Sequence, residues 1–481
     1  MKKRYLLVVF VALCPLLSTG QGIIDLGSKR EIFVDRYFID KLDGVSLLMH
    51  HPRDEGPVLY YDKPWEGVFG MGSTVIKDND IYRFYYRGLP SLELVKEGVA
   101  YEKNVFCYAQ SNDGIHWEKP NLKIYEYNGS YDNNILMKEC LSLFIDTKPN
   151  TALEQRYKGL FPVEQKGLYA YISSDGIHWN KLKEEPLITK GAFDGGNIPF
   201  WSDSEQCYVC YFRIWSLGGY DGFRTIARTT SPDFIHWTEP IAMTFGDTPM
   251  EHLYTNQTAP YFRAPHIYIN IGARFWPDRQ VVTDKQAQEL NVWPGYYGDC
   301  SDAYLASTRG GSVYDRTFME SFVRPGIGME NWVSRTNYPV LNVVQTGPTE
   351  MSIYVNHNYA QPTAHLRRYS MRLDGFASLS APYKGGEALT KFFKFSGNEL
   401  EINYSTSAAG ELRFEIQDEQ GKAIQGFTME ESDVIIGNEI ERVVSWKGKS
   451  DVKDLASKTI RLRIFMKDAD IFSLKFRNKN Q

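Results

Sequence analysis

Three stretches of the chain match one another: Ser111-Asn-Asp-Gly-Ile-His-Trp117, Ser173-Ser-Asp-Gly-Ile-His-Trp179 and Ser231-Pro-Asp-Phe-Ile-His-Trp237. In the first two, the Asp-Gly pair supplies the positive φ that a tight turn needs. In all three, the serine and aspartate side chains are suited to bond the backbone of the turn, and the tryptophan is placed to pack under the neighbouring sheet. Each stretch is therefore predicted to be a turn, and its histidine to be structural.

The spacing of these turns predicts the architecture. Their tryptophans are about 60 residues apart, which is close to the length of a four-stranded sheet with its loops. Short alternating strands fill the intervals, and the aromatic fraction of 14% together with 39 glycines favours sheets joined by tight turns. We therefore expect an all-β chain with a five-bladed β-propeller over residues 23–380, its blades at about 65–120, 133–182, 193–240, 254–310 and 338–375.

The two ends of this propeller region carry further strands. Residues 31–40 form an early strand without a blade of its own, and we expect it to complete the last blade, which removes an exposed sheet edge. Residues 382–387 have the composition of a linker. Beyond them the sequence alternates strictly, which predicts a small β-sandwich domain over residues 387–481.

The first 20 residues have the pattern of a signal peptide. Lys2, Lys3 and Arg4 precede an apolar run over residues 5–17, and small residues follow at 18–20. The run is shorter than the ~20 apolar residues of a membrane anchor. We expect an exported protein, periplasmic or extracellular, with no membrane span. Its net charge of -5 offers no basic surface for a nucleic acid.

Cysteines and histidines do not predict a metal site. Cys207 and Cys210 are three apart in a strand-like run, so their side chains point to opposite faces, and a structural role is favoured over a zinc site. We expect neither a metal nor a cofactor.

The candidate catalytic residues are acids that recur where successive blades begin. Inner strands of a propeller surround a central channel, so acids about 60 residues apart are predicted to become neighbours at one end. The candidates are Glu66, Asp146, Asp194 and Glu251, with Asp302 and Glu350 marking a less clear fifth position. Asp146 and Asp194 also suit turn caps, which is the structural alternative for both.

With these acids and the repeated turns, the chain resembles the five-bladed β-propeller glycoside hydrolases over about residues 30–375. These are the fructosidases and arabinanases of families 32, 43 and 68, in which a C-terminal sandwich is common. The resemblance implies cleavage of O-glycosidic bonds in a poly- or oligosaccharide by carboxylate acid/base catalysis. It makes Glu66 the base or nucleophile, Asp146 the acid that tunes pKa values and binds sugar, and a third-blade acid the proton donor. Members usually have Asp in blade one and Glu in blade three, so either Glu66 and Asp194 exchange roles or Glu251 is the donor.

Polar and aromatic residues near the same predicted loops are candidates for substrate binding. They are Trp65, Asn197, Trp201, Arg213, His252, Asn256 and Arg274, with Gln257 and His365 as further polar candidates. The two arginines serve equally well as partners of the acids. The insertion over residues 276–299, with a predicted helix at 283–290, is placed to cover the site as a lid.

Two alternatives stay open on the sequence. One is a propeller that binds a glycan without cleaving it. The other is a sialidase-like hydrolase, because the Ser-x-Asp-Gly-x-x-Trp turns are similar to the Asp-boxes of sialidases. Such an enzyme requires three arginines around a carboxylate and a tyrosine nucleophile, and the sequence identifies no such set.

Overall fold

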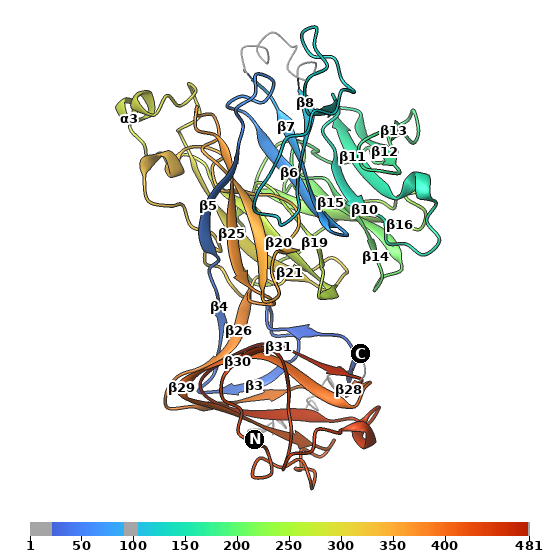
Figure 1. Cartoon of the computed structure of the whole chain (residues 1–481), viewed down its shortest axis with the longest axis vertical. Helices are drawn as coiled ribbons and strands as arrows, with labels where there is room; N and C mark the ends of the chain where they lie inside the picture. Colours follow the sequence, from blue (N-terminus) through green and yellow to red (C-terminus); the bar gives the residue numbers. More distant parts are fainter. Residues whose placement is uncertain (1–21, 91–103, 480–481) are drawn as a thin grey trace, which may run out of the picture.

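The computed structural model describes residues 22–90 and 104–479, and the chain is all-β apart from a few short helical turns (Figure 1). The predicted signal peptide lies outside the described residues. Five sheets form a propeller, and strands from both ends of the chain form a second, curled sheet below it in Figure 1. Among the described residues, no helix has the length and hydrophobicity that crossing a bilayer requires. The predicted five-bladed propeller is confirmed.

The first three blades have four strands each in sequential order. Blade 1 contains β6 (Met71–Asp78), β7 (Ile81–Gly88), β8 (Val105–Ser111) and β9 (Ile135–Met137). Blade 2 contains β10 (Ser142–Ile145), β11 (Tyr157–Val163), β12 (Gly167–Ser173) and β13 (Asn180–Lys181). Blade 3 contains β14 (Ile198–Ser202), β15 (Cys207–Trp215), β16 (Arg224–Ser231) and β17 (Ile241–Ala242).

The last two blades are less regular. Blade 4 contains β18 (His252–Leu253), β19 (Ala259–Tyr261), β20 (Ala264–Trp276) and β21 (Cys300–Thr308). Blade 5 contains β22 (Tyr338–Pro339), β23 (Val344–Gln345), β24 (Glu350–His357), β25 (His365–Arg372) and β5 (Arg53–Tyr60). The strand β5, from the start of the chain, pairs with β25 and closes the ring.

The closing strand is therefore β5, and the prediction that residues 31–40 complete the last blade is wrong. In that segment β2 (Glu31–Ile32) pairs with a C-terminal strand, and β3 (Ile39–Asp43) pairs with another. Phe33, Phe38 and Ile39 are buried in the core of the second sheet. The alternation of this segment marks a strand, but its apolar side chains match a core that the C-terminal residues form.

The second sheet, which we call the terminal sheet, combines the two ends of the chain. Its C-terminal strands are β26 (Ala377–Ala381), β27 (Gly386–Thr390), β29 (Glu399–Gln417), β30 (Asn438–Val443) and β31 (Arg461–Arg477). Besides β2 and β3, the N-terminal strand β4 (Ser46–Met49) pairs with β26. Next to the terminal sheet, β1 (Ile24–Gly27) and β28 (Phe393–Phe395) pair in a separate two-stranded sheet. The C-terminal strands predicted from alternation are present, but they do not form this sheet alone.

The three matching turns have the geometry that the sequence predicts. In the first, Ser111 Oγ accepts from the backbone N–H groups of Asp113 and Gly114, and Asp113 Oδ1 accepts from those of Ile115 and His116. The His116 ring also lies 2.7 Å from the Asp113 carboxylate. The turn at Asp175 repeats these contacts. The turn at Asp233 repeats those of the aspartate and its own N–H, with Phe234 in the place of the glycine. Their histidines are exposed and bound within the turn, so they are structural.

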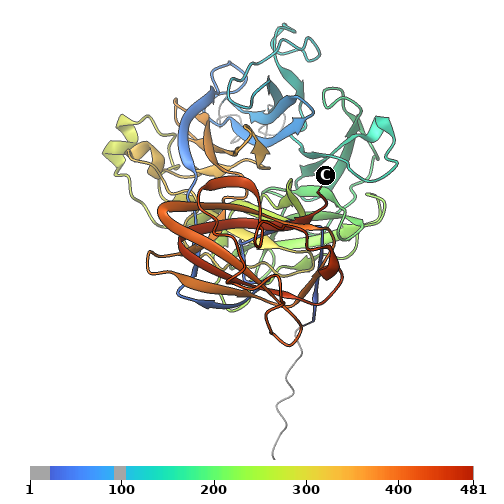
Figure 2. The ribbon, with the colours of Figure 1, turned by 60° about the horizontal axis from the view of Figure 1, so that its bottom comes forward.

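A buried carboxylate joins the propeller to the terminal sheet. Asp374 is fully buried and accepts from Tyr261 and Arg263 of blade 4 and from Ser473 of the terminal sheet. Arg30 lies 3.6 Å from the same carboxylate. The terminal sheet is therefore fixed to one end of blades 4 and 5, and Figure 2 shows it in front of the propeller ring.

Candidate functional site

The propeller has two different ends. We call the mouth the end at which the inner strands β6, β10, β14, β19 and β22 begin. Because strands of a blade alternate in direction, the third strands β8, β12 and β16 end at the opposite side, where the three Ser–Asp turns lie. The terminal sheet is also on that side, since Ile32 and Val34 pack with Tyr261 and Ala264 where β19 ends and β20 begins. The mouth is free of the second sheet.

Asp146 and Trp201 lie at the end opposite to the mouth, contrary to the expectation. Asp146 follows the last residue of β10, and its carboxylate accepts from Lys158 Nζ at 2.5 Å and the Tyr208 hydroxyl at 2.7 Å. Trp201 is near the end of β14 and packs on Tyr208, with Lys148 Nζ 5.2 Å from the centre of its ring. Phe144 and Ile145 belong to the short strand β10. Asp146 therefore comes after the end of this strand and not before its start.

Glu66 lies at the mouth end but is completely buried. Its carboxylate accepts from the Tyr86 hydroxyl at 2.6 Å, from Lys119 Nζ at 2.7 Å and from the backbone N–H of Lys63 at 2.9 Å. The neighbouring Trp65 donates from its indole nitrogen to Asn134. These contacts give Glu66 and Trp65 a role in the packing of blade 1.

Glu251 and Arg274 belong to an ion-pair network within blade 4. Arg274 on β20 binds Asp302, its partner across β21, at 2.7 Å and Glu251 at 2.8 Å. Glu251 also lies 2.8 Å from Arg316. Of the two roles considered for Arg274, substrate binding and pairing with acids, the structure supports pairing with acids.

Asp194 is the predicted acid that remains accessible at the mouth. Its side chain is 45% exposed, and its Oδ2 lies 2.6 Å from Nη1 of the buried Arg213. Arg213 also donates to the backbone oxygen of Tyr254, and its guanidinium lies 4.5 Å from the centre of the Tyr254 ring. Asp194 and Arg213 are therefore two predicted residues that the fold does bring together.

Two predicted asparagines shape the loop that carries Asp194. Asn197 donates to the backbone oxygens of Phe193 and Gly195, and Asn256 of blade 4 donates to that of Gly196. Both side chains are almost completely buried. They hold the loop before β14 in place, while the other predicted polar residues, Gln257 and His365, bond to Pro339 and Thr363.

Two further arginines, which the sequence analysis missed, lie with Arg213 around Tyr254. The Arg224 guanidinium is 4.4 Å from the Trp215 ring centre and 5.2 Å from that of Tyr254. The Arg335 guanidinium is 5.8 Å from the centre of the Tyr254 ring. We call Arg213, Arg224 and Arg335 the arginine triad. Arg213 lies near the end of β15 and Arg224 begins β16, both in blade 3, whereas Arg335 precedes β22 of blade 5, so no local motif reveals the group.

His252 also contacts Arg224. Its Nδ1 accepts from the backbone N–H of Arg224 at 3.2 Å, and its ring lies 4.9 Å from that of Phe223. Burial and the charge of Arg224 lower the pKa of His252 below its usual value. His252 is therefore at the mouth as predicted, as a neutral ring at neutral pH.

A second mouth acid, Asp299, was also missed. It precedes β21 at the end of the blade 4 insertion, and burial raises the pKa of Asp299 against the opposing effects of Ser334, Arg335 and Arg224. The completely buried Tyr338 lies among the same groups, since its hydroxyl interacts electrostatically with Arg335, Asp299 and Arg213. The only sequence signal was its place after Gly298, directly before a strand.

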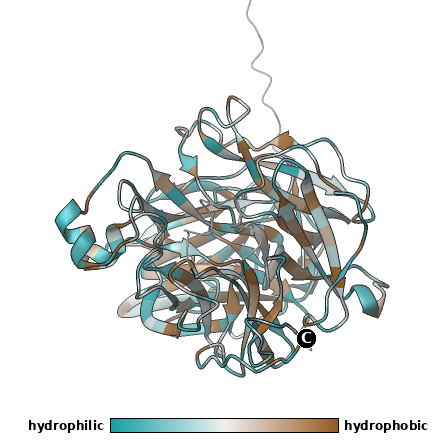
Figure 3. Ribbon diagram, turned by 90° about the horizontal axis from the view of Figure 1, so that it is seen from above, coloured by the Kyte–Doolittle hydropathy of each residue, from teal (hydrophilic) through white to brown (hydrophobic). Residues whose placement is uncertain are grey.

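The insertion between β20 and β21 lies at the mouth. Its helix α3 (Asp284–Glu289) is confirmed, with Thr283 as N-cap, and this mainly hydrophilic helix projects from the edge of the propeller (Figure 3). Farther along, Trp293 and Tyr296 pack against Phe69 of blade 1 at ring-centre distances of 5.4 and 5.6 Å. The insertion therefore reaches from blade 4 to blade 1, and Tyr296 also contacts Arg335 of the triad.

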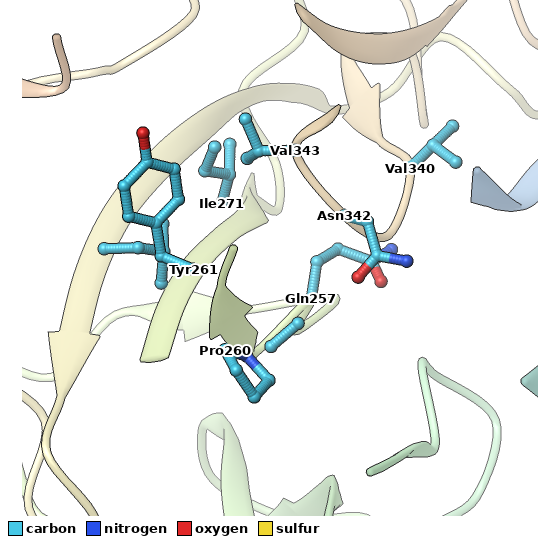
Figure 4. A pocket seen from close by; sticks show the side chains of 9 residues that line it. Gln257, Pro260, Tyr261, Ile271, Val340, Asn342 and Val343 are labelled. Carbon is cyan, nitrogen blue, oxygen red and sulfur yellow. The ribbon is translucent and has the colours of Figure 1, made fainter. Parts of the chain in front are cut away.

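A crevice lies deeper, between the inner strands of blades 4 and 5 (Figure 4). Gln257, Pro260, Tyr261, Ile271 and Asn342 are among the residues that line it. Its cavity volume is about 20 Å³, which is room for one water molecule. It is too small for a sugar, so the candidate site is the group of residues at the mouth.

The described residues contain no group of three or more His, Cys, Asp or Glu side chains arranged to hold a metal ion. The described cysteines, Cys107, Cys140, Cys207, Cys210 and Cys300, are free thiols.

No protein-family model and no curated protein matches the sequence. Solved structures do match the fold. One is a family 43 arabinoxylan arabinofuranohydrolase from Bacillus subtilis, with 11% identity, a TM-score of 0.40 and coverage of 87% of this chain and 97% of that chain. Another is a fructofuranosidase variant from Schwanniomyces occidentalis, with 10% identity, a TM-score of 0.37 and coverage of 87% and 96%. A third is a β-1,2-mannobiose phosphorylase from Listeria innocua, with 11% identity, a TM-score of 0.41 and coverage of 69% and 99%. The described sheets themselves form the five-bladed propeller of this chain. At such low similarity to these proteins, its chemistry rests on its own residues.

Proposed function

We propose that the chain is an exported glycoside hydrolase whose reaction takes place at the mouth of the propeller. Asp299 is the general acid, and Asp194 is the base or nucleophile. This pair replaces the set of Glu66, Asp146 and Asp194 that the family resemblance implies, because Glu66 is buried in an ion pair and Asp146 is at the other end.

One observation carries the proposal: two carboxylates with different environments interact with the same arginine. Arg224 interacts electrostatically with Asp194, and it also affects the pKa of Asp299. Asp194 forms an ion pair with Arg213 as the carboxylate, whereas burial favours the protonated form of Asp299. Hydrolysis of a glycosidic bond requires one protonated and one ionised carboxyl group, and unequal environments are how proteins assign these roles.

The surrounding side chains suit a sugar. The rings of Trp215, Tyr254, Phe275 and Tyr338 lie around the arginines. Flat aromatic faces accept the apolar faces of sugar rings, and polar groups between them orient hydroxyl groups. The chemistry assigned to these residues uses no cofactor.

The test is the loss of glycan hydrolysis in Asp194→Asn and Asp299→Asn, each made singly. Plant and host glycans, including sialylated ones, are screened with the unaltered protein first, and the variants are assayed on the substrate it cleaves. Each variant is expected to lose about 10²- to 10⁴-fold in kcat/KM. Asp221→Asn, which changes an exposed acid in a blade 3 loop, is the matched control and keeps full activity.

The pH profile gives an independent check. A general acid works only when protonated, so the rate falls as the pH rises through the raised pKa of Asp299. In Asp299→Asn the alkaline limb is expected to disappear. Activity that survives in both variants contradicts the site assignment, and binding of a glycan without any cleavage by the unaltered protein identifies a binding propeller instead.

A further inference from the structure

The arginine triad differs from other buried arginines of the propeller. Arg274, Arg228 and Arg368 each have carboxylate partners, at 2.7, 2.8 and 2.9 Å respectively. Among the described residues, neither Arg224 nor Arg335 has a carboxylate oxygen within 4.0 Å. Among the described residues, Asp194 is the acid paired with the triad, and burial makes Asp299 less able to supply a second negative charge. Within the described part of the chain, the triad therefore carries more positive charge than its acid partner offsets.

Several buried donors of this group have no partner. Among the described residues, no hydrogen bond reaches Arg213 Nε, Arg224 Nε, the indole nitrogen of Trp215 or the hydroxyl of Tyr338. Arg213 and Tyr338 are only 3% and 1% exposed. Nε of Arg228 and of Arg368 likewise has no hydrogen bond within the described residues. The triad differs from them because its unpartnered donors occur together with two arginines that have no carboxylate partner, and this combination suits a ligand with several acceptor atoms.

Contacts with aromatic rings orient the guanidinium groups of the triad for binding such a ligand. The guanidinium groups of Arg213 and Arg224 lie 4.4 to 4.5 Å from the ring centres of Tyr254 and Trp215. Stacking fixes the plane of a guanidinium and leaves its N–H edge available, and that edge matches the two oxygens of a carboxylate. The cost of ordering these side chains is already met before a ligand binds.

We propose that the arginine triad binds an oxyanion and that the substrate is an acidic sugar, whose carboxylate the triad holds beside Asp194 and Asp299. The sugar part of this inference rests on the proposed glycoside hydrolase function. The oxyanion site rests on the arginines alone. Inorganic phosphate is the other source of the same chemistry, and the experiment separates the two.

The test measures binding by titration calorimetry with the full chain and ligands that cannot be cleaved. Glucuronate and galacturonate are compared with glucose, galactose and inorganic phosphate. The acidic sugars are expected to bind at least about tenfold more tightly than the neutral ones, and less tightly as salt is added, because salt screens charge pairs. This comparison needs no variant and so does not depend on the folding of one.

Variants then locate the site. Arg224→Gln and Arg335→Gln are each expected to lower the affinity for the acidic sugars by about tenfold or more, and Arg224→Lys to restore only part of it because lysine lacks the planar fork. Arg324→Gln removes an exposed arginine of the blade 4 region and is the charge-matched control.

Equal affinity for acidic and neutral sugars overturns the inference and leaves the proposed hydrolase function standing. Tighter binding of phosphate than of both acidic sugars overturns the assignment of a sugar carboxylate. Tight binding of the acidic sugars by a chain that cleaves no glycan supports the triad while the hydrolase proposal fails.

Discussion

At the scale of single residues, burial distinguishes two acids that the sequence treats alike. Glu66 and Asp194 both precede an inner strand, but Glu66 is fully buried and Asp194 is half exposed. The two side chains that donate hydrogen bonds to Glu66, those of Lys119 and Tyr86, come from other strands and loops of blade 1. Of these two acids, only Asp194 is accessible to a substrate.

We expect Glu66→Gln to destabilise the protein without affecting catalysis. The amide cannot pair with Lys119, and a buried hydrogen-bonded charge is lost, which costs about 1–3 kcal/mol in the free energy of unfolding. Denaturant unfolding measures this loss, and kcat/KM per folded molecule is expected to stay within about twofold.

Asp62→Asn is the matched control, because Asp62 binds the same lysine at 2.8 Å but is 63% exposed. Its effect on the free energy of unfolding is expected to be small, as for exposed ion pairs. A stable Glu66→Gln protein without activity would return Glu66 to the catalytic set.

At the scale of elements, the three Ser–Asp turns show how one conformation accepts different residues. Gly114 and Gly176 have φ values of +74° and +77°, and Phe234 takes the equivalent place with φ of +68°. The side chain of Phe234 is buried, and its ring lies 5.2 Å from that of Tyr208 and 5.6 Å from that of Trp237. Packing outweighs the strain of the left-handed backbone.

Phe234→Gly is therefore expected to destabilise the protein although it relieves that strain. Removing a buried phenyl ring costs about 3–5 kcal/mol, against about 1–2 kcal/mol for the left-handed conformation. The expected net loss in the free energy of unfolding is about 2 kcal/mol, measured by denaturant unfolding.

The matched variant is Gly176→Ala, which adds a side chain at the equivalent position instead of removing one. A Cβ at this position lies 2.5 Å from the Tyr85 hydroxyl, and φ is unfavourable for alanine. This variant is also expected to be destabilised. An increase in stability of Phe234→Gly would show that strain, and not packing, dominates this turn.

At the scale of the whole molecule, the propeller and the terminal sheet depend on each other. The chain starts in the terminal sheet, builds the propeller from β5 to β25 and returns to the terminal sheet at β26. Asp374 stands at this return and binds residues of both parts. The two parts are therefore expected to unfold in one transition.

Asp374→Ala is expected to weaken both parts together. The change removes the buried carboxylate that pairs with Arg263 and lies near Arg30, which keeps Glu401 at 2.6 Å. Breaking a buried ion pair costs about 3–5 kcal/mol. Calorimetry is expected to show a single transition at a lower temperature. Asp25→Asn, an exposed acid of β1, is the control and leaves the transition unchanged. Two separate transitions in the unaltered protein would contradict this coupling.

The sequence alone determined the blades and their turns, because each Ser–Asp turn is made by contacts within a few residues and repeats with the period of one sheet. It also determined the helix α3, whose capping box is local. The pairing of β1 to β4 with strands more than 300 residues later was decided only by the tertiary structure, since alternation marks a strand but not its partner.

Some residues of the candidate site were likewise predicted from the sequence, and others were recognised only in the tertiary structure. Asp194, Arg213 and His252 were predicted from the sequence, and the structure places each of them in or next to a strand at the mouth. Asp146 was misplaced because the side of the propeller depends on where β10 ends, and a shift of a few residues moves an acid from one end to the other. The assembly of Arg224, Arg335 and Asp299 around Tyr254 was decided by the tertiary structure. Three blades supply these residues, and only closure of the ring brings them within reach of one another.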